Sequence, residues 1–244
     1  MTALTGITAS ELEAALVAEG EPAFRARQVL DWVYRKKVTD FSQMTSLGKA
    51  LRERLAARFP LRTLEMVRRQ GSQDTTQKFL FKLQDGRFIE SVVIPANPAL
   101  YGEKSDRHTL CVSTQVGCAM ACAFCASGLN GLTRNLGADE IVEQIMQAEA
   151  LTGERMDNLV FMGMGEPLAN LPNFLKAVEI INAPWGIGIG ARHITVSTSG
   201  LVPRIKALAD QPLQIRLAVS LHGATLERRR GNGRRGAMFE RQTR

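Results

Sequence analysis

Hydrophobic positions in the first sixty residues recur at helical spacing. Apolar side chains of residues 11–18 follow Thr8 and Ser10, either of which is a suitable N-cap for a helix. Two further apolar faces with the same spacing are expected over residues 24–33 and 41–59. Residues 1–60 are therefore predicted to form a small helical module. Its basic side chains are either a solvated face or a phosphate-contacting surface: Arg25, Arg27, Arg35, Lys36 and Lys37.

The pattern changes to strands after about residue 61. Residues 67–69, 77–83 and 87–94 alternate or are rich in β-formers, and Asp85-Gly86 is a strong hairpin signal. A β-rich extension and linker is therefore expected over residues 61–107.

From residue 108 the chain alternates short apolar runs with helical patterns. Strands are expected at 109–114, 158–162, 193–197 and 214–221, and helices at 138–151, 171–181 and 202–209. Repeated βα units build an open α/β sheet or a β/α barrel, in which chemistry gathers at the carboxyl ends of the strands. The fold class is therefore α/β, with this core expected over residues 108–226.

Composition places the chain among ordinary globular proteins, with 45% hydrophobic and 23% charged residues. A membrane span or a secretory signal is not expected, so the cytoplasm is the predicted location. The net charge of +7 is uneven, because residues 227–244 hold seven arginines and two glutamates. That basic segment lacks apolar periodicity and is expected to be an atypical tail, so net charge is weak evidence for an RNA partner.

All four cysteines lie between residues 111 and 125, which indicates metal ligation rather than a disulfide framework. Cys118, Cys122 and Cys125 form a CxxxCxxC motif with three thiolates for one centre. A [4Fe–4S] cluster with one exchangeable iron position fits three protein ligands. A closed zinc site is the alternative, although it needs a fourth ligand.

This motif resembles that of the radical S-adenosylmethionine (SAM) superfamily. The longer string LCVSTQVGCAMACAFCASG, starting at Leu110, is similar to the RlmN/Cfr family of RNA adenine methyltransferases. FMGMGEP, STSG and SLH follow in the family's order, and the resemblance extends from about residue 5 to about residue 230. It implies a partial (β/α) radical SAM barrel, a [4Fe–4S] cluster and SAM.

The resemblance also implies roles for individual residues. Gly165, Glu166 and Ser197 are expected to bind SAM. The segment Ser220, Leu221 and His222 is expected to bind it as well. Glu90 matches the family's general base, and Cys111 matches the cysteine that pairs with a distant C-terminal one to resolve an enzyme–RNA adduct. From composition alone, Glu90 is a solvated strand carboxylate and Cys111 a small buried hydrophobe.

The implied reaction is methylation of C2 of an adenosine in ribosomal and transfer RNA. The substrates would be those RNAs, a flavodoxin or ferredoxin would supply the electron, and a monomer is expected. In the family, a later cysteine carries the methyl group, and this sequence has no cysteine after Cys125. We therefore expect a truncated or frameshifted chain that binds a cluster without completing methylation. A Cfr-type C8 methyltransferase and an inactive Fe–S or RNA-binding fragment are the alternatives. An apolar edge at 214–221 is expected to be exposed and prone to association.

Overall fold

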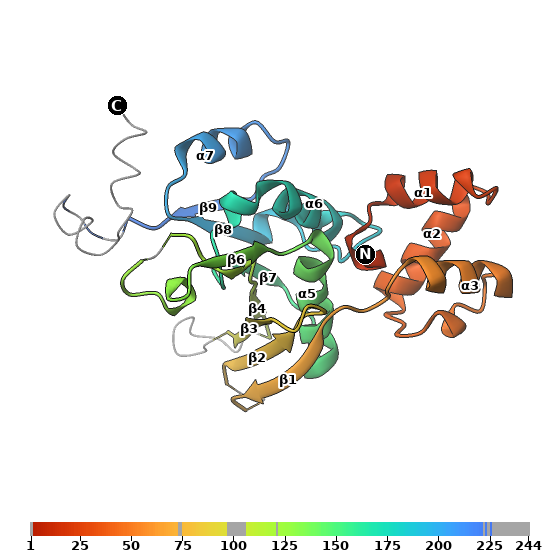
Figure 1. Cartoon of the computed structure of the whole chain (residues 1–244), viewed down its shortest axis with the longest axis horizontal. Helices are drawn as coiled ribbons and strands as arrows, with labels where there is room; N and C mark the ends of the chain where they lie inside the picture. Colours follow the sequence, from red (N-terminus) through yellow and green to blue (C-terminus); the bar gives the residue numbers. More distant parts are fainter. Residues whose placement is uncertain are drawn as a thin grey trace.

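The computed structural model describes residues 2–72, 75–96, 106–120, 122–221, 223 and 225. Two layers make up the main body, a twisted sheet and the helices packed on one of its faces, and a helical module lies beside the helix layer (Figure 1). Among the described helices, none combines the length and apolar character needed to cross a membrane.

The N-terminal module is helical, as its periodicity predicts. Thr8 caps α1 in a capping box, because its side chain accepts from the Glu11 N–H while the Glu11 carboxylate accepts from the Thr8 N–H. Each of the two later apolar faces is split between two elements. The module consists of η1 (Leu4–Gly6), α1 (Ala9–Ala18), α2 (Phe24–Leu30), the π-helical η2 (Asp31–Arg35), η3 (Phe41–Gln43) and α3 (Lys49–Arg58).

The three strands of the β-rich extension are also confirmed. They are β1 (Glu65–Gln70), β2 (Gln77–Lys82) and β3 (Phe88–Pro95), joined as an antiparallel meander. The predicted turn lies between β2 and β3, where Gly86 has a φ of +80° and donates its N–H to the Leu83 carbonyl over 2.9 Å. Strand β3 then pairs antiparallel with the first strand of the core, so the extension and core share one sheet.

Four parallel strands continue this sheet. The order across all seven strands is β1-β2-β3-β4-β7-β8-β9. The core strands are β4 (His108–Cys111), β7 (Asn158–Phe161), β8 (Ile194–Thr198) and β9 (Arg216–Val219). The crossover elements are α5 (Ala138–Thr152), η5 (Pro167–Asn170), α6 (Leu171–Asn182), η6 (Ala191–His193) and α7 (Val202–Ala209).

Two predicted strands are longer than the observed ones. The strand expected at 109–114 ends at Cys111, because the Thr114 N–H donates to the Met164 carbonyl instead of continuing the ladder. The chain then forms a separate hairpin of β5 (Gln115–Gly117) and β6 (Leu132–Asn135), with η4 (Ala126–Gly128) between them. The strand expected at 214–221 is confined to β9.

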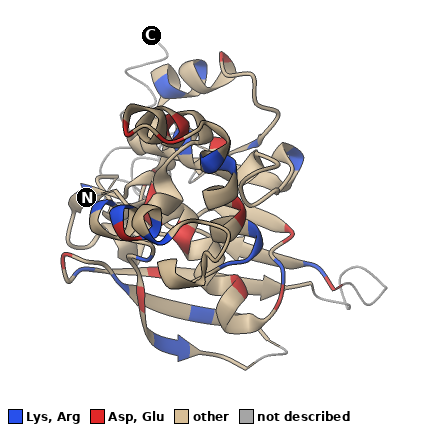
Figure 2. Cartoon of the chain, turned by 90° about the vertical axis from the view of Figure 1, so that its right-hand side faces the viewer, with Lys and Arg blue, Asp and Glu red and all other residues tan. Residues whose placement is uncertain are grey.

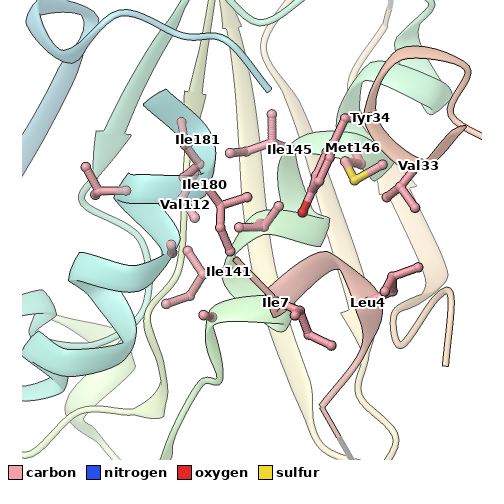
Figure 3. Packing of buried hydrophobic residues seen from close by; sticks show 14 of the residues in the cluster. Leu4, Ile7, Val33, Tyr34, Val112, Ile141, Ile145, Met146, Ile180 and Ile181 are labelled. Atoms are coloured by element: carbon pink, nitrogen blue, oxygen red, sulfur yellow. The ribbon is translucent and has the colours of Figure 1, made fainter. Parts of the chain in front are cut away.

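The core lies between one face of the sheet and helices α5 and α6. Phe79, Phe81 and Phe161 are fully buried on that face. Figure 3 shows Ile141 and Ile145 of α5 beside Ile180 of α6, with side chains of the helical module on the other side of α5. Helix α5 therefore joins the module to the sheet.

The opposite face of the sheet is left uncovered by these helices. Burial alternates strictly along β2, β7 and β8, so every second residue is half-buried or exposed. We call this surface the open face. The register places these half-buried residues on it: Lys78, Leu80, Glu90, Val92, Cys111, Val160, Ser197 and Ala218.

Candidate active site

The open face brings together predicted site residues that are far apart in sequence. Cys111 is paired with Val92 on one side and Val160 on the other, and Glu90 lies two residues before Val92 on β3. Ser197 pairs with Ala218 on the same face. A carboxylate, a thiol and a hydroxyl thus point to one side of the sheet.

The cysteine loop begins where β5 ends. The Cys118 N–H donates to the Gly131 carbonyl over 3.0 Å, and the Cys125 N–H donates to the Cys122 carbonyl over 3.1 Å. Gly117 is required at this entry, because its φ is +76° and a Cβ would lie 2.0 Å from the Gly131 oxygen. The β5–β6 hairpin therefore holds the two ends of the loop together.

The three thiols of this loop are free and electrostatically coupled. Burial raises the pKa of the Cys118 thiol, and the neighbouring Glu166, Cys122 and Cys125 raise it further. Burial likewise raises the pKa of the Cys122 thiol, with Cys125 and Glu166 adding to the shift. Negative groups gathered in this way favour a cationic centre among them.

This donor set fits an iron–sulfur cluster with one position left open. Three thiolates in one short loop supply three ligands. Across the described residues, no three His, Cys, Asp or Glu side chains form a ready-made metal cage.

The FMGMGEP segment crosses the carboxyl end of β7 in close contact with the chain after β4. A Cβ on Gly163 would lie 2.7 Å from Ser113 Oγ, and one on Gly165 would lie 2.5 Å from Gln115 Cβ. Gly165 also has a φ of +102°. Both glycines are thus needed for close backbone approach.

Glu166 is almost fully buried, with 3% of its surface exposed. One carboxylate oxygen accepts from the Leu168 N–H over 3.2 Å, and the other accepts from the Ser199 N–H over 2.8 Å. These bonds join the ends of β7 and β8 and fix the carboxylate near the cysteine loop. Each oxygen retains a lone pair for an ammonium group.

The STSG and SLH segments lie at the ends of β8 and β9. Ser197 is half-buried within β8, and the Ser220 N–H donates to the Thr198 carbonyl over 2.9 Å. Ser220 and Leu221 are exposed, and Leu221 keeps 54% of its surface open. His222 lies outside the described residues.

Glu90 forms an ion pair with Lys78, whose Nζ lies 2.9 Å from its Oε1. The backbone carbonyl of Glu90 accepts from Ser113 Oγ over 2.6 Å, which connects β3 to the chain after β4. The Glu90 side chain is 41% exposed, so it is accessible from the open face.

Cys111 is the last residue of β4. Burial raises the pKa of its thiol, although the Met162 N–H donates to the sulfur and partly offsets the shift. The Cys111 thiol is thus mostly protonated at neutral pH and a weak nucleophile.

Three residues that position the site were missed by sequence reasoning. Gln144 Oε1 accepts from Ser91 Oγ and from the Ser113 N–H, each over 2.8 Å. Gln115 Oε1 accepts from the Glu166 N–H over 2.7 Å. Only the nearby motif could have indicated Ser113 and Gln115, and nothing in the sequence singled out Gln144.

The three-thiolate loop and the buried carboxylate lie at the carboxyl ends of the strands, beside a sheet face that the described helices leave uncovered, and this is the arrangement of an α/β protein with a place for a metal cluster beside a small polar ligand. A family model, the radical SAM superfamily, matches residues 112–244, and the chain belongs to that superfamily. Its members use a [4Fe–4S] cluster and SAM. The match continues through residues 227–244, where an atypical tail was expected.

More specific similarities point to RNA methyltransferases. Residues 2–60 match the N-terminal domain of the ribosomal RNA large subunit methyltransferase. A protein of Akkermansia muciniphila, named as a probable dual-specificity RNA methyltransferase RlmN, is 58% identical over 92% of this chain and 62% of its own length. One of Opitutus terrae named RlmN 3 is 53% identical over 92% of this chain and 63% of its own length.

A solved structure supports the fold. The crystal structure of a radical SAM methyltransferase from Sphaerobacter thermophilus is 46% identical, with a TM-score of 0.82, and the match covers 91% of this chain and 64% of that one. The chain thus spans less than two thirds of the length of these relatives.

Proposed function

We propose that this chain is the cofactor-binding part of an RlmN-type RNA methyltransferase, which methylates C2 of an adenosine in ribosomal and transfer RNA. The observation that carries the proposal is the convergence of Glu90, Cys111 and Ser197 on one open face. The cysteine loop and Glu166 lie at the carboxyl ends of the strands of that sheet.

Each residue has a proposed role in this reaction. Cys118, Cys122 and Cys125 hold the cluster, which when bound supplies the electron for reductive cleavage of SAM. Glu166 accepts from the ammonium group of SAM, while Gly165 leaves room for it. Ser197, Ser220, Leu221 and His222 complete the SAM site.

Two residues act on the RNA rather than on SAM. Glu90 removes a proton from the adenine as the ring regains aromaticity, and its exposure on the open face suits a base that meets a large substrate. Cys111 is proposed to resolve a covalent enzyme–RNA adduct: a base would take the proton of its thiol, and the thiolate would form a disulfide with the later cysteine that holds the RNA as the sulfur–carbon bond to the adenine breaks.

The partners follow from this reaction. The RNA substrates are proposed to contact residues 1–60, an assignment supported by the match of that segment to a ribosomal RNA methyltransferase domain. A small electron carrier such as flavodoxin or ferredoxin supplies the electron. We propose a monomer that works in the cytoplasm, where these RNAs are found.

Anaerobic reconstitution tests the cofactor site on the 244-residue chain itself. We expect uptake of iron and sulfide, followed by release of 5′-deoxyadenosine when SAM and a reductant are added. The triple variant Cys118→Ala, Cys122→Ala, Cys125→Ala should lose the iron. The matched variant Cys111→Ala should keep it.

Two outcomes contradict the proposal. One is a wild-type chain that takes up zinc and refuses iron, and the other is a triple variant that retains its iron. For the whole protein, mass spectrometry of the RNA separates 2-methyladenosine from the 8-methyladenosine of a Cfr-type enzyme.

A further inference from the structure

The two edges of the sheet differ in chemistry. At the β9 edge two of the three exposed side chains are apolar, Leu217 and Val219, and the third is Arg216. At the other edge every residue of β1 is exposed or half-buried, and three of the six are charged. A bulge between Met66 and Arg68 interrupts the register of β1, which disfavours addition of another strand there.

Two adjacent arginines of β1, Arg68 and Arg69, lie on opposite faces of the sheet. Arg69 lies on the helix side, where its guanidinium is 5.7 Å from the Phe79 ring centroid and donates to the Leu151 carbonyl of α5. Arg68 pairs with Leu80 and so lies on the open face. Within the described part of the chain, the Arg68 side chain forms no hydrogen bond or ion pair.

Two lysines of β2 share the open face with Arg68. Lys78 faces Glu90 over 2.9 Å, and Lys82 faces Glu65 over 3.7 Å. Both lysine side chains are more than 40% exposed. Ion pairs this exposed contribute little, so each ammonium group can exchange its carboxylate for a phosphate at low cost.

An aromatic ring lies among these cations. Phe88 pairs with Lys82 and keeps 45% of its surface exposed. Two residues further along the same face of β3 is Glu90. We call the surface formed by Arg68, Lys78, Lys82 and Phe88 the hairpin platform. Figure 2 shows basic residues on these strands as well as on the N-terminal helices.

We propose that the hairpin platform docks a single-stranded segment of the RNA substrate and leads it to Glu90. The cations contact backbone phosphates and a base stacks on Phe88, a combination by which β-sheet faces bind single-stranded nucleic acid. This inference rests on the proposed function. The positive charge of the platform favours RNA over a further protein segment as the occupant. An apolar protein segment would desolvate these cations without compensation, whereas RNA phosphates would pair with them.

Fluorescence anisotropy with a labelled transfer RNA transcript tests the docking surface. We expect the double variant Arg68→Gln, Lys82→Gln to bind the transcript about tenfold more weakly than wild type. The slope of log affinity against log salt should fall by about two, one for each lost phosphate contact. Phe88→Ala should weaken binding about fivefold or more without changing the salt slope, because stacking is not ionic.

The matched control removes two cations at the amino ends of the parallel strands, in the variant Arg155→Gln, Arg192→Gln. Both residues are exposed and lie outside residues 1–60: Arg155 precedes β7, and Arg192 is in η6 just before β8. Circular dichroism and thermal unfolding should show that all variants fold. An affinity loss in the control that equals or exceeds that of the platform variant overturns the docking surface while leaving the proposed function intact. A wild-type chain that fails to bind RNA at all contradicts the proposed function itself.

Discussion

Gly165 and Glu166 are adjacent in the chain but have different roles: the first allows close backbone packing, and the second holds a carboxylate in a fixed position. Gly165 must leave space, because it packs against Gln115 with a φ that disfavours any side chain. Glu166 must keep its carboxylate in place, which it does by accepting two backbone N–H groups. The conformation of the first residue therefore determines where the charge of the second lies.

Gly165→Ala is expected to destabilise the chain and displace Glu166. The added Cβ would meet Gln115 side-chain and backbone atoms at 2.5 to 2.9 Å, in addition to the strain of a positive φ. We expect a loss of about 2–4 kcal/mol in the free energy of unfolding, measured by urea denaturation.

Gly153→Ala is the matched control, because Gly153 has a φ of +75° with nothing within 4 Å of its Cβ position. It carries the backbone strain without the collision. Equal losses in the two variants would show that packing against Gln115 is unimportant.

Asp139 gives the stability a pH dependence. It is 7% exposed on α5, its carboxylate accepts from the Ala3 N–H over 2.7 Å, and burial raises its pKa. A native pKa above the unfolded value means that the folded state binds the proton more tightly. The stability from this group is therefore present below the ordinary value of 3.8 and is lost as the pH rises through the native pKa.

Asp139→Asn should remove this loss, because asparagine is neutral and its amide oxygen can still accept from Ala3. We expect the variant to gain stability relative to wild type as the pH rises above 3.8, measured by urea unfolding at several pH values. A difference between the two proteins that stays constant with pH would contradict this expectation.

At the scale of elements, helix α5 joins the helical module to the sheet through buried acids as well as apolar packing. Glu143 is fully buried and accepts from the Thr63 N–H, the Thr63 hydroxyl and the Leu64 N–H. Glu149 accepts from Lys37 Nζ over 2.7 Å. The segment between α3 and β1 is thus anchored to the middle of α5.

Glu143→Ala is expected to cost about 3 kcal/mol of unfolding free energy, because it leaves two backbone N–H groups and a hydroxyl without their acceptor. Chemical denaturation provides the measurement. Glu179→Ala on the exposed side of α6 is the matched control and should change stability by less than about 0.5 kcal/mol. Similar losses in both variants would mean that Glu143 does not anchor this segment.

At the scale of the molecule, the sheet ends in an apolar edge on the side of β9. Leu217 and Val219 are 43% and 40% exposed, and β9 pairs only with β8 among the described strands. An exposed apolar edge is a site for association with another chain. The β9 edge therefore favours self-association of the chain, in opposition to the monomer proposed above.

The double variant Leu217→Lys, Val219→Lys should suppress self-association of the 244-residue chain, because lysines at an edge hinder pairing. Sedimentation velocity over a range of concentrations measures the effect. Val17→Lys, which replaces a residue of α1 that is 52% exposed, should leave association unchanged. A wild-type chain that stays monomeric throughout that range would contradict the prediction.

The sequence by itself determined the local features. Periodicity located the helices and strands, Asp85-Gly86 located a turn, and the spacing of Cys118, Cys122 and Cys125 indicated a cluster, because each signal depends on neighbours within a few residues. Only the tertiary structure decided what depends on register and crossover. It placed Glu90 beside Lys78 and on the same face as Cys111, and it set the Ser199 N–H against Glu166. Such contacts join residues distant in the chain, and a shift of one residue in register would turn each side chain to the other face.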